Sequence, residues 1–157
     1  MRVGSGFDVH AFGPGDAVML GGVRVPHSHG VVAHSDGDVL LHALVDALLG
    51  AAGLGDIGQH FPDSDPKWKG ADSAHFVAEA LRLLSQHGQK VVNVDLTLLA
   101  QLPRIARWRD QIRASIAGQL SLPESAVNIK ATTTEHLGFI GRAEGLAAMA
   151  TVLIDER

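Results

Sequence analysis

The chain has 157 residues, of which 46% are hydrophobic and 19% charged, and its formal net charge is −4. One domain over residues 1–157 is expected rather than a disordered tail. The acidic balance argues against a nucleic-acid partner, because nucleic-acid-binding domains usually present a basic face. The absence of cysteine excludes disulfides and thiolate chemistry. No apolar run approaches the roughly 20 residues that span a bilayer, and the N-terminus lacks the apolar core of a secretion signal, so no membrane partner is expected.

Short extended segments are predicted at the start of the chain. Residues 2–10 alternate apolar with small or polar side chains, which is typical of a strand. Residues 18–20 and 23–25 flank Gly21 and Gly22. This pattern predicts a two-residue hairpin, because glycine tolerates the positive φ that both turn positions need.

Helices are predicted in the middle of the chain. Residues 35–52 place apolar side chains at helical spacing before Gly53, and residues 72–87 repeat the pattern before Gly88. A third helix is expected over residues 103–120, because a proline at the first helical position loses no hydrogen bond.

Further strands are predicted at residues 91–99, 127–131 and 145–154. The last is apolar at nearly every position and is expected to be covered on both faces. Together these elements predict an α+β fold, a mixed β-sheet with helices packed on one face.

The face of this sheet that the helices leave open needs a partner. Small Ala147, Ala148 and Ala150 in the last strand would allow another surface to approach closely. We therefore expect the chain to form an oligomer.

A candidate metal site is built from residues far apart in the sequence. Asp8 and His10 stand two apart on a strand, so their side chains emerge on one face. His42 lies in an otherwise apolar helix, with Asp38 and Asp46 four residues away on the same helical face, where either carboxylate could orient the imidazole. One carboxylate and two imidazoles suit an open catalytic Zn²⁺ site. The alternative is an exposed strand pair and a hydrogen-bonded core histidine.

The start of the first helix has two interpretations that do not exclude each other. Ser35 could be the N-cap, with Asp38 completing a weak capping box. The free amides of the helix start could instead attract phosphate, with His34 donating to a phosphoryl oxygen.

Two polar loops also leave alternatives open. Asp56, Asp63 and Asp65 lie in a Gly- and Pro-rich segment, where they could shape turns or hold substrate hydroxyls. Residues 130–135 could pair a strand end with a Thr132–Glu135 capping box. Alternatively, their hydroxyls and amides could hold a diphosphate, with a glutamate ligand for Mg²⁺.

The glycine-rich run over residues 138–145 permits tight turns. Within it, Arg142 and Glu144 could form a simple ion pair, or Arg142 could face an anion.

Taken together, these segments resemble the 2-C-methyl-D-erythritol 2,4-cyclodiphosphate synthases of the non-mevalonate isoprenoid pathway. The resemblance covers nearly the whole chain. Its carriers, in order, are residues 6–10 (GFDVH), 33–38 (AHSDGD) leading to His42, 55–58 (GDIG), 61–66 (FPDSDP) and 130–135 (KATTTE) with Gly138 and Phe139.

The resemblance implies a cytoplasmic bacterial homotrimer with active sites between subunits. Its reaction releases CMP from 4-diphosphocytidyl-2-C-methyl-D-erythritol 2-phosphate, a cytidine diphosphate substrate, and leaves the cyclic diphosphate. Zn²⁺ would be held by Asp8, His10 and His42, and Glu135 would help to hold a second divalent ion, Mg²⁺ or Mn²⁺. His34 and Thr133 would stabilise the transition state.

The implied substrate contacts fall into a phosphate group, a methylerythritol group and a cytidine group, the last supplied by the adjacent subunit. They are Ser35, Asp56, Ile57, Gly58, Phe61, Pro62, Asp63, Ser64, Asp65, Ala100, Gln101, Leu102, Pro103, Arg104, Ile105, Ala106, Ala131, Thr132, Thr134, Phe139 and Arg142.

The expected chemistry is intramolecular phosphoryl transfer, in which positioning and charge neutralisation supply most of the catalysis. Two other functions fit the same residues. One is a metal-dependent hydrolase that cuts a nucleoside diphosphate with water, and the other is a trimer that binds isoprenoid phosphates without turnover.

Overall fold

The computed structural model describes residues 1–156, and within this range five strands form the main sheet, in the order β4-β1-β7-β5-β6. The strands are β1 (Arg2–Gly13), β4 (Gly30–Val31), β5 (Gln89–Leu99), β6 (Val127–Thr132) and β7 (Gly145–Glu156). β5 and β6 are parallel and the other pairs antiparallel, so the predicted mixed sheet is confirmed. A separate hairpin joins β2 (Ala17–Leu20) to β3 (Val23–Pro26), with the predicted glycine turn.

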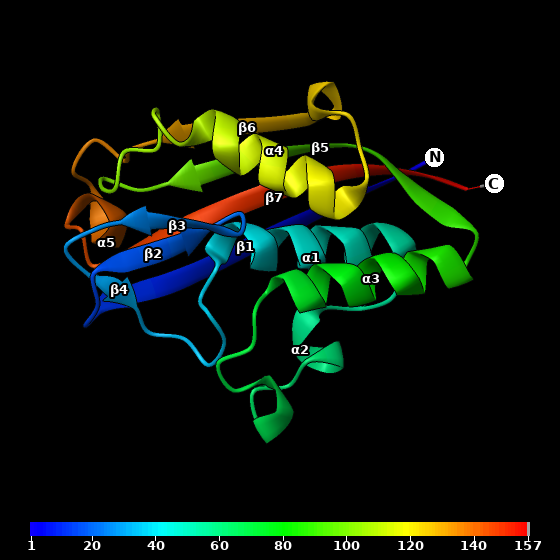
Figure 1. Ribbon diagram of the computed structural model, residues 1–157, viewed down its shortest axis with the longest axis horizontal. Helices are drawn as coiled ribbons and strands as arrows, with labels where there is room; N and C mark the ends of the chain where they lie inside the picture. The colour runs from blue at the N-terminus through cyan, green and yellow to red at the C-terminus, as the bar shows by residue number, and fades with distance from the viewer. Residues whose placement is uncertain (157) are drawn as a thin grey trace.

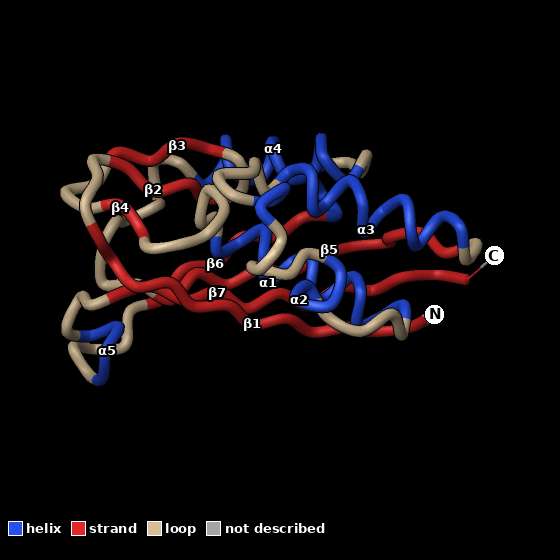
Figure 2. Tube along the Cα trace, turned by 90° about the horizontal axis from the view of Figure 1, so that it is seen from below, coloured by secondary structure: helices blue, strands red, loops and turns tan. Residues whose placement is uncertain are grey.

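The longer helices lie on one face of the sheet, as expected for this α+β fold (Figures 1 and 2). They are α1 (Val39–Ala52), α3 (Ala74–Gln86) and α4 (Arg109–Leu120). Shorter turns of helix are α2 (Ile57–His60), η1 (Pro66–Trp68), η2 (Glu124–Ala126) and α5 (Gly138–Gly141). α5 lies at one end of the sheet, away from α1 and α3 (Figure 2). Within residues 1–156, no helix is long and apolar enough to cross a membrane.

The predicted starts of two helices were wrong. α1 begins at Val39 rather than Ser35, because Asp38 is the N-cap and its carboxylate accepts the Leu41 amide. α4 begins at Arg109, six residues after Pro103, and turns and bends occupy the intervening segment. Ile105 in that segment is only 2% exposed. Its apolar spacing therefore reflects burial in a turn packed on the core, not a helix.

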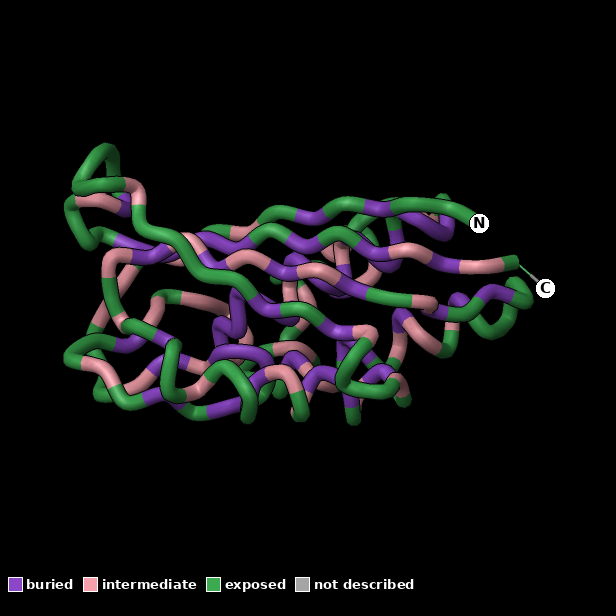
Figure 3. Tube along the Cα trace, turned by 90° about the horizontal axis from the view of Figure 1, so that it is seen from above, coloured by how far each residue is buried: buried purple, intermediate pink, exposed green. Residues whose placement is uncertain are grey.

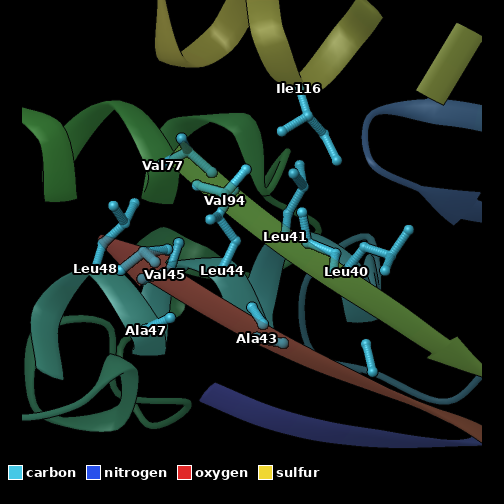
Figure 4. Packing of buried hydrophobic residues seen from close by; sticks show 14 of the residues in the cluster. Leu40, Leu41, Ala43, Leu44, Val45, Ala47, Leu48, Val77, Val94 and Ile116 are labelled. Carbon is cyan, nitrogen blue, oxygen red and sulfur yellow. The ribbon is translucent and has the colours of Figure 1, made fainter. Parts of the chain in front are cut away.

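The core is centred on α1, which packs between the sheet on one side and α3 and α4 on the other (Figure 4). Leu40, Leu44 and Leu48 are fully buried along this helix. Only His42, Asp46 and Gly50 of α1 are not buried. The helix is otherwise apolar on every side. The polar side chains of His42 and Asp46 therefore lie at the boundary of the core.

β1 and α1 are in direct backbone contact. A Cβ added at Gly4 would lie 2.0 Å from the Ala47 carbonyl oxygen, and one at Gly6 would lie 1.9 Å from the Ala43 carbonyl oxygen. Only glycine permits so close an approach. This contact sets the distance between the strand that carries Asp8 and the helix that carries His42.

The opposite face of the sheet is open in the single chain (Figure 3). Phe7 and Met149 are paired across β1 and β7 on this face, and their exposed fractions are 55% and 51%. The prediction that β7 is covered on both faces was therefore wrong within the single chain. Ala148 and Ala150 were also misplaced, because they are buried on the α1 side, opposite Asp8 and Gly6.

The loop after β6 does not contain the capping box considered for Thr132 and Glu135. Glu135 adopts a φ of 54°, and its amide donates to the Thr133 hydroxyl. The next helix, α5, begins only at Gly138. Because Glu135 is in the left-handed region, the chain turns there instead of starting a helix.

Candidate functional site

Three side chains from β1 and α1 converge on one point. Asp8 and His10 project from the α1 side of β1, and His42 projects from α1 towards them. Asp8 Oδ2 lies 2.9 Å from His10 Nε2 and 3.1 Å from His42 Nδ1. His10 Nε2 and His42 Nδ1 are 3.1 Å apart. The predicted convergence of these three residues is therefore confirmed.

The electrostatics of this cluster favour a cation. Burial alone would raise the pKa of Asp8, but hydrogen bonds and charge from His10 and His42 outweigh it and lower that pKa to about 2. The Asp8 carboxylate therefore stays ionised at neutral pH. The carboxylate lies beside two imidazole nitrogens. Lone pairs that face one another at this distance repel unless a proton or a metal ion lies between them.

The donor set fits a divalent metal. A carboxylate and two imidazoles are a common catalytic zinc set, and tetrahedral ligands about 2.0–2.2 Å from zinc stand about 3.3 Å from one another. The three donor atoms here are 2.9 to 3.1 Å apart. A small outward shift of the side chains would therefore admit the ion.

Neither acidic neighbour of His42 on α1 orients its ring, contrary to the sequence expectation. Asp38 is fully buried, and its carboxylate accepts the amides of Gly21 and Gly22 as well as capping α1. Asp46 accepts the Ile57 amide at 2.8 Å, which anchors α2. Burial raises the pKa of both carboxyls.

The His42 ring is held instead from its other nitrogen. His42 Nε2 lies 2.9 Å from Ser73 Oγ and 3.0 Å from Ser35 Oγ. Ser73 is fully buried at the start of α3 and also contacts the Asp36 carboxylate. Sequence patterns missed both Ser73 and Asp36, because the contact joins segments 37 residues apart.

A cavity of about 540 Å³ opens beside the three donors. It brings together many predicted residues from the segments over 8–10, 34–42 and 57–63. The predicted site residues that line it are Asp8, His10, His34, Ser35, His42, Ile57, Gly58, Phe61, Pro62 and Asp63. His34 Nε2 is buried and has no hydrogen-bond partner in the described chain. His34 also lines the cavity, although this nitrogen itself is buried.

The start of α1 lies at Val39, after the Asp38 N-cap, and not at Ser35. The Asp38 carboxylate caps the helix, and the chain around Ser35 lies before the first helical turn. The prediction that Ser35 is the N-cap was therefore wrong.

Two of the three aspartates in the segment before α3 act as helix caps in the single chain. Asp56 caps α2 in a capping box with Gln59, and Asp65 caps η1. Asp63 faces the cavity. Sequence patterns missed Trp68 and Phe76, which line the same cavity and pack with Phe61.

A second cavity, of about 500 Å³, lies between the loop after β5 and the loop after β6. Its lining includes the predicted residues Gln101, Leu102, Arg104, Thr133, Glu135 and Arg142. Arg142 also forms an ion pair with Glu144 at 2.6 Å, which is the simpler of the two sequence interpretations. The two cavities share no lining residue.

The remaining predicted residues line neither cavity. Ala100 and Ile105 are buried. Phe139 lies in α5, and the others lie on the adjoining loops or strands: Asp56, Ser64, Asp65, Pro103, Ala106, Ala131, Thr132 and Thr134.

The fold and the three-donor cluster define a protein with a candidate metal site beside a cavity. Residues 1–155 match the YgbB family. The chain is 58% identical over 157 residues to the 2-C-methyl-D-erythritol 2,4-cyclodiphosphate synthase of Pseudomonas aeruginosa (strain UCBPP-PA14), with 100% of both chains covered.

Solved structures agree with this assignment. The bifunctional IspDF protein from Campylobacter jejuni is 45% identical, with a TM-score of 0.95 over 99% of this chain and 42% of that longer protein. The IspF protein of Plasmodium falciparum in complex with CDP is 34% identical, with a TM-score of 0.87 over 99% of this chain and 96% of that protein. The chain therefore belongs to the YgbB family.

Proposed function

We propose that the chain is a 2-C-methyl-D-erythritol 2,4-cyclodiphosphate synthase, a cyclising phosphorus–oxygen lyase. In its reaction, an oxygen of the substrate 2-phosphate attacks the β-phosphorus and forms a new P–O bond. The bond between the β-phosphorus and the bridging oxygen breaks, and that oxygen leaves with CMP. No water is added, so the products are the cyclic diphosphate and CMP.

The observation that carries this proposal is the convergence of Asp8, His10 and His42 beside a cavity, in a chain that matches synthases over its full length. Phosphoryl transfer needs little covalent help from protein, and positioning and charge neutralisation supply most of the rate. A metal ion held by these three donors next to the cavity would meet that need.

The three donors would hold Zn²⁺, and Glu135 would help to hold a second divalent ion, Mg²⁺ or Mn²⁺, on the diphosphate. When bound, such ions polarise phosphoryl oxygens and neutralise the charge of the leaving group. Glu135 is exposed and lines the second cavity, where its carboxylate is free to meet a ligand.

The chain's other groups bind and orient the substrate. His34, which lines the cavity, would donate to a phosphoryl oxygen, with Ser35 helping to hold phosphate. Thr133 lines the second cavity and would support the transition state from the cytidine side. Asp56 and the loop over residues 61–65 would bind the methylerythritol part, and the segment 100–106 with Ala131 and Thr132 would receive the cytidine diphosphate.

We also propose that the active enzyme is a homotrimer whose open sheet faces meet at a central axis. The exposed apolar side chains of Val3, Phe7 and Met149 on this face favour burial against other copies. The separation of the two cavities supports active sites assembled from neighbouring subunits. In that arrangement, one subunit supplies the metal and methylerythritol contacts, and its neighbour supplies the cytidine contacts.

Substitution of His42 tests the function. His42→Ala should remove zinc and abolish CMP release from the cytidyl substrate with Mg²⁺ present, whereas His87→Ala, on an exposed imidazole at the end of α3, should leave both unchanged. Product mass separates cyclisation from hydrolysis, because hydrolysis adds one water. Absence of CMP with the unaltered protein would favour a binding trimer, and zinc-free His42→Ala with normal turnover would refute the metal role.

A further inference from the structure

The hydroxyl of Ser73 has an unusual role for its position. Ser73 is the N-cap residue of α3, where a serine side chain normally accepts an amide of its own helix. Here it makes no capping bond. Its Oγ instead lies between His42 Nε2, at 2.9 Å, and Asp36 Oδ1. The hydroxyl therefore connects a carboxylate to the imidazole of the candidate metal ligand.

The direction of these hydrogen bonds is determined by Asp36. An ionised carboxylate only accepts hydrogen bonds, and Asp36 already receives the amides of Asp38 and Ser73 at 3.0 Å each. The Ser73 hydroxyl must then donate its hydrogen to Asp36. Its oxygen is left as an acceptor, so the hydrogen between Ser73 and His42 belongs to His42 Nε2.

The consequence appears at the other nitrogen of the ring. A neutral imidazole carries one N–H, so protonation at Nε2 leaves Nδ1 with a free lone pair. His42 Nδ1 is the atom that faces Asp8 Oδ2 and His10 Nε2, at 3.1 Å from each. The Ser73 contact thus selects the tautomer that a metal requires.

We propose that Asp36 and Ser73 are a positioning pair that holds His42 in its Nε2–H tautomer and so presents Nδ1 to the metal. This inference rests on the proposed metal centre. Ser73 is fully buried and lines neither cavity, so it acts through His42 and not on a substrate. Ser35 differs, because it lines the cavity and its oxygen accepts the Gly37 amide instead of being polarised by a carboxylate.

The test is zinc affinity, measured by competition with a chromogenic chelator. Loss of a group that orients a metal-bound histidine typically weakens metal binding about 10- to 100-fold, and this is the result expected for Ser73→Ala. Ser73→Thr keeps the hydroxyl and should retain most of the affinity. Ser85→Ala, the same change at an exposed position of α3, should bind zinc like the unaltered protein.

Affinity and stability must be measured together. If Ser73→Ala lowers the thermal midpoint but binds zinc unchanged, its role is structural and the proposal is overturned. If that variant does not fold, NMR of the zinc-loaded unaltered protein decides. The His42 Nε2 proton should then be visible and slow to exchange with water, and exchange as fast as in an exposed imidazole would refute the pair.

The same experiment separates the two proposals. If the unaltered protein binds zinc no better than His42→Ala, the metal centre fails and the positioning pair fails with it. If the unaltered protein binds zinc tightly and Ser73→Ala matches it, only the positioning pair fails.

Discussion

Gly6→Ala should damage both the fold and the metal centre, although the substitution adds only one methyl group. The new Cβ would lie 1.9 Å from the Ala43 carbonyl oxygen and 2.8 Å from the Ala47 amide nitrogen. Contacts of a real Cβ essentially never fall below 3.0 Å. Both obstacles are backbone atoms of α1, so no rotation of a side chain relieves them. β1 and α1 must separate by about 1 Å.

The magnitude follows from that separation. Overpacking a core typically costs 1–3 kcal/mol, and a clash against backbone belongs at the upper end. For a chain of this size, about 3 kcal/mol corresponds to a fall of roughly 6–12 °C in thermal midpoint. Asp8 is two residues from Gly6 on the same face, and His42 adjoins Ala43. The donor distances of 2.9 to 3.1 Å should therefore open unevenly, and zinc should bind at least tenfold more weakly.

Thermal unfolding and chelator competition measure the two effects. Gly118→Ala is the matched control, because a Cβ there meets nothing within 4 Å in α4. It should raise stability by about 0.5–1 kcal/mol, since alanine is the better helix former. If Gly6→Ala keeps the unaltered midpoint and zinc affinity, the close contact of β1 with α1 does not set the site.

Other predictions address the buried carboxylate, the metal and the open sheet face. Because burial raises the pKa of Asp38 above its ordinary 3.8, the unfolding free energy of the zinc-free protein should decline as pH rises from 3.8 through the folded value. Asp38→Asn removes a hydrogen-bond acceptor, but its side chain is neutral at every pH. The difference in unfolding free energy between the unaltered protein and this variant, measured by urea unfolding from pH 4 to 7, should therefore shrink as pH rises. A constant difference would contradict the raised pKa. Removing zinc held at 100 times its dissociation constant should cost about 2.7 kcal/mol, or roughly 5–10 °C in thermal midpoint, and a chelator that leaves the midpoint unchanged would contradict a bound metal. Met149→Asp places a charge on the exposed apolar sheet face and should convert trimers to monomers in sedimentation, while a variant that stays trimeric would move the interface elsewhere.

The amino-acid sequence by itself determined most of the elements and the three residues of the candidate metal site. Alternation over residues 2–10 put Asp8 and His10 on one face, and an imidazole at position 42 stood out in an apolar helix. These are local patterns, because the period of a strand or helix fixes which side chains share a face. The glycine hairpin at Gly21 and Gly22 is equally local, and the structure confirms it.

Only the tertiary structure decided which polar group meets which. α1 begins at Val39 and not at Ser35, because the Asp38 carboxylate caps the helix and also accepts two amides of the distant β2–β3 turn. The contact with that turn leaves no local pattern in the sequence. His42 is oriented by Ser73, from the start of α3, instead of by the acids on its own helix face. Such partners are selected by how α1, α3 and the hairpin pack, and a pairing across 31 residues carries no period that a sequence pattern could detect.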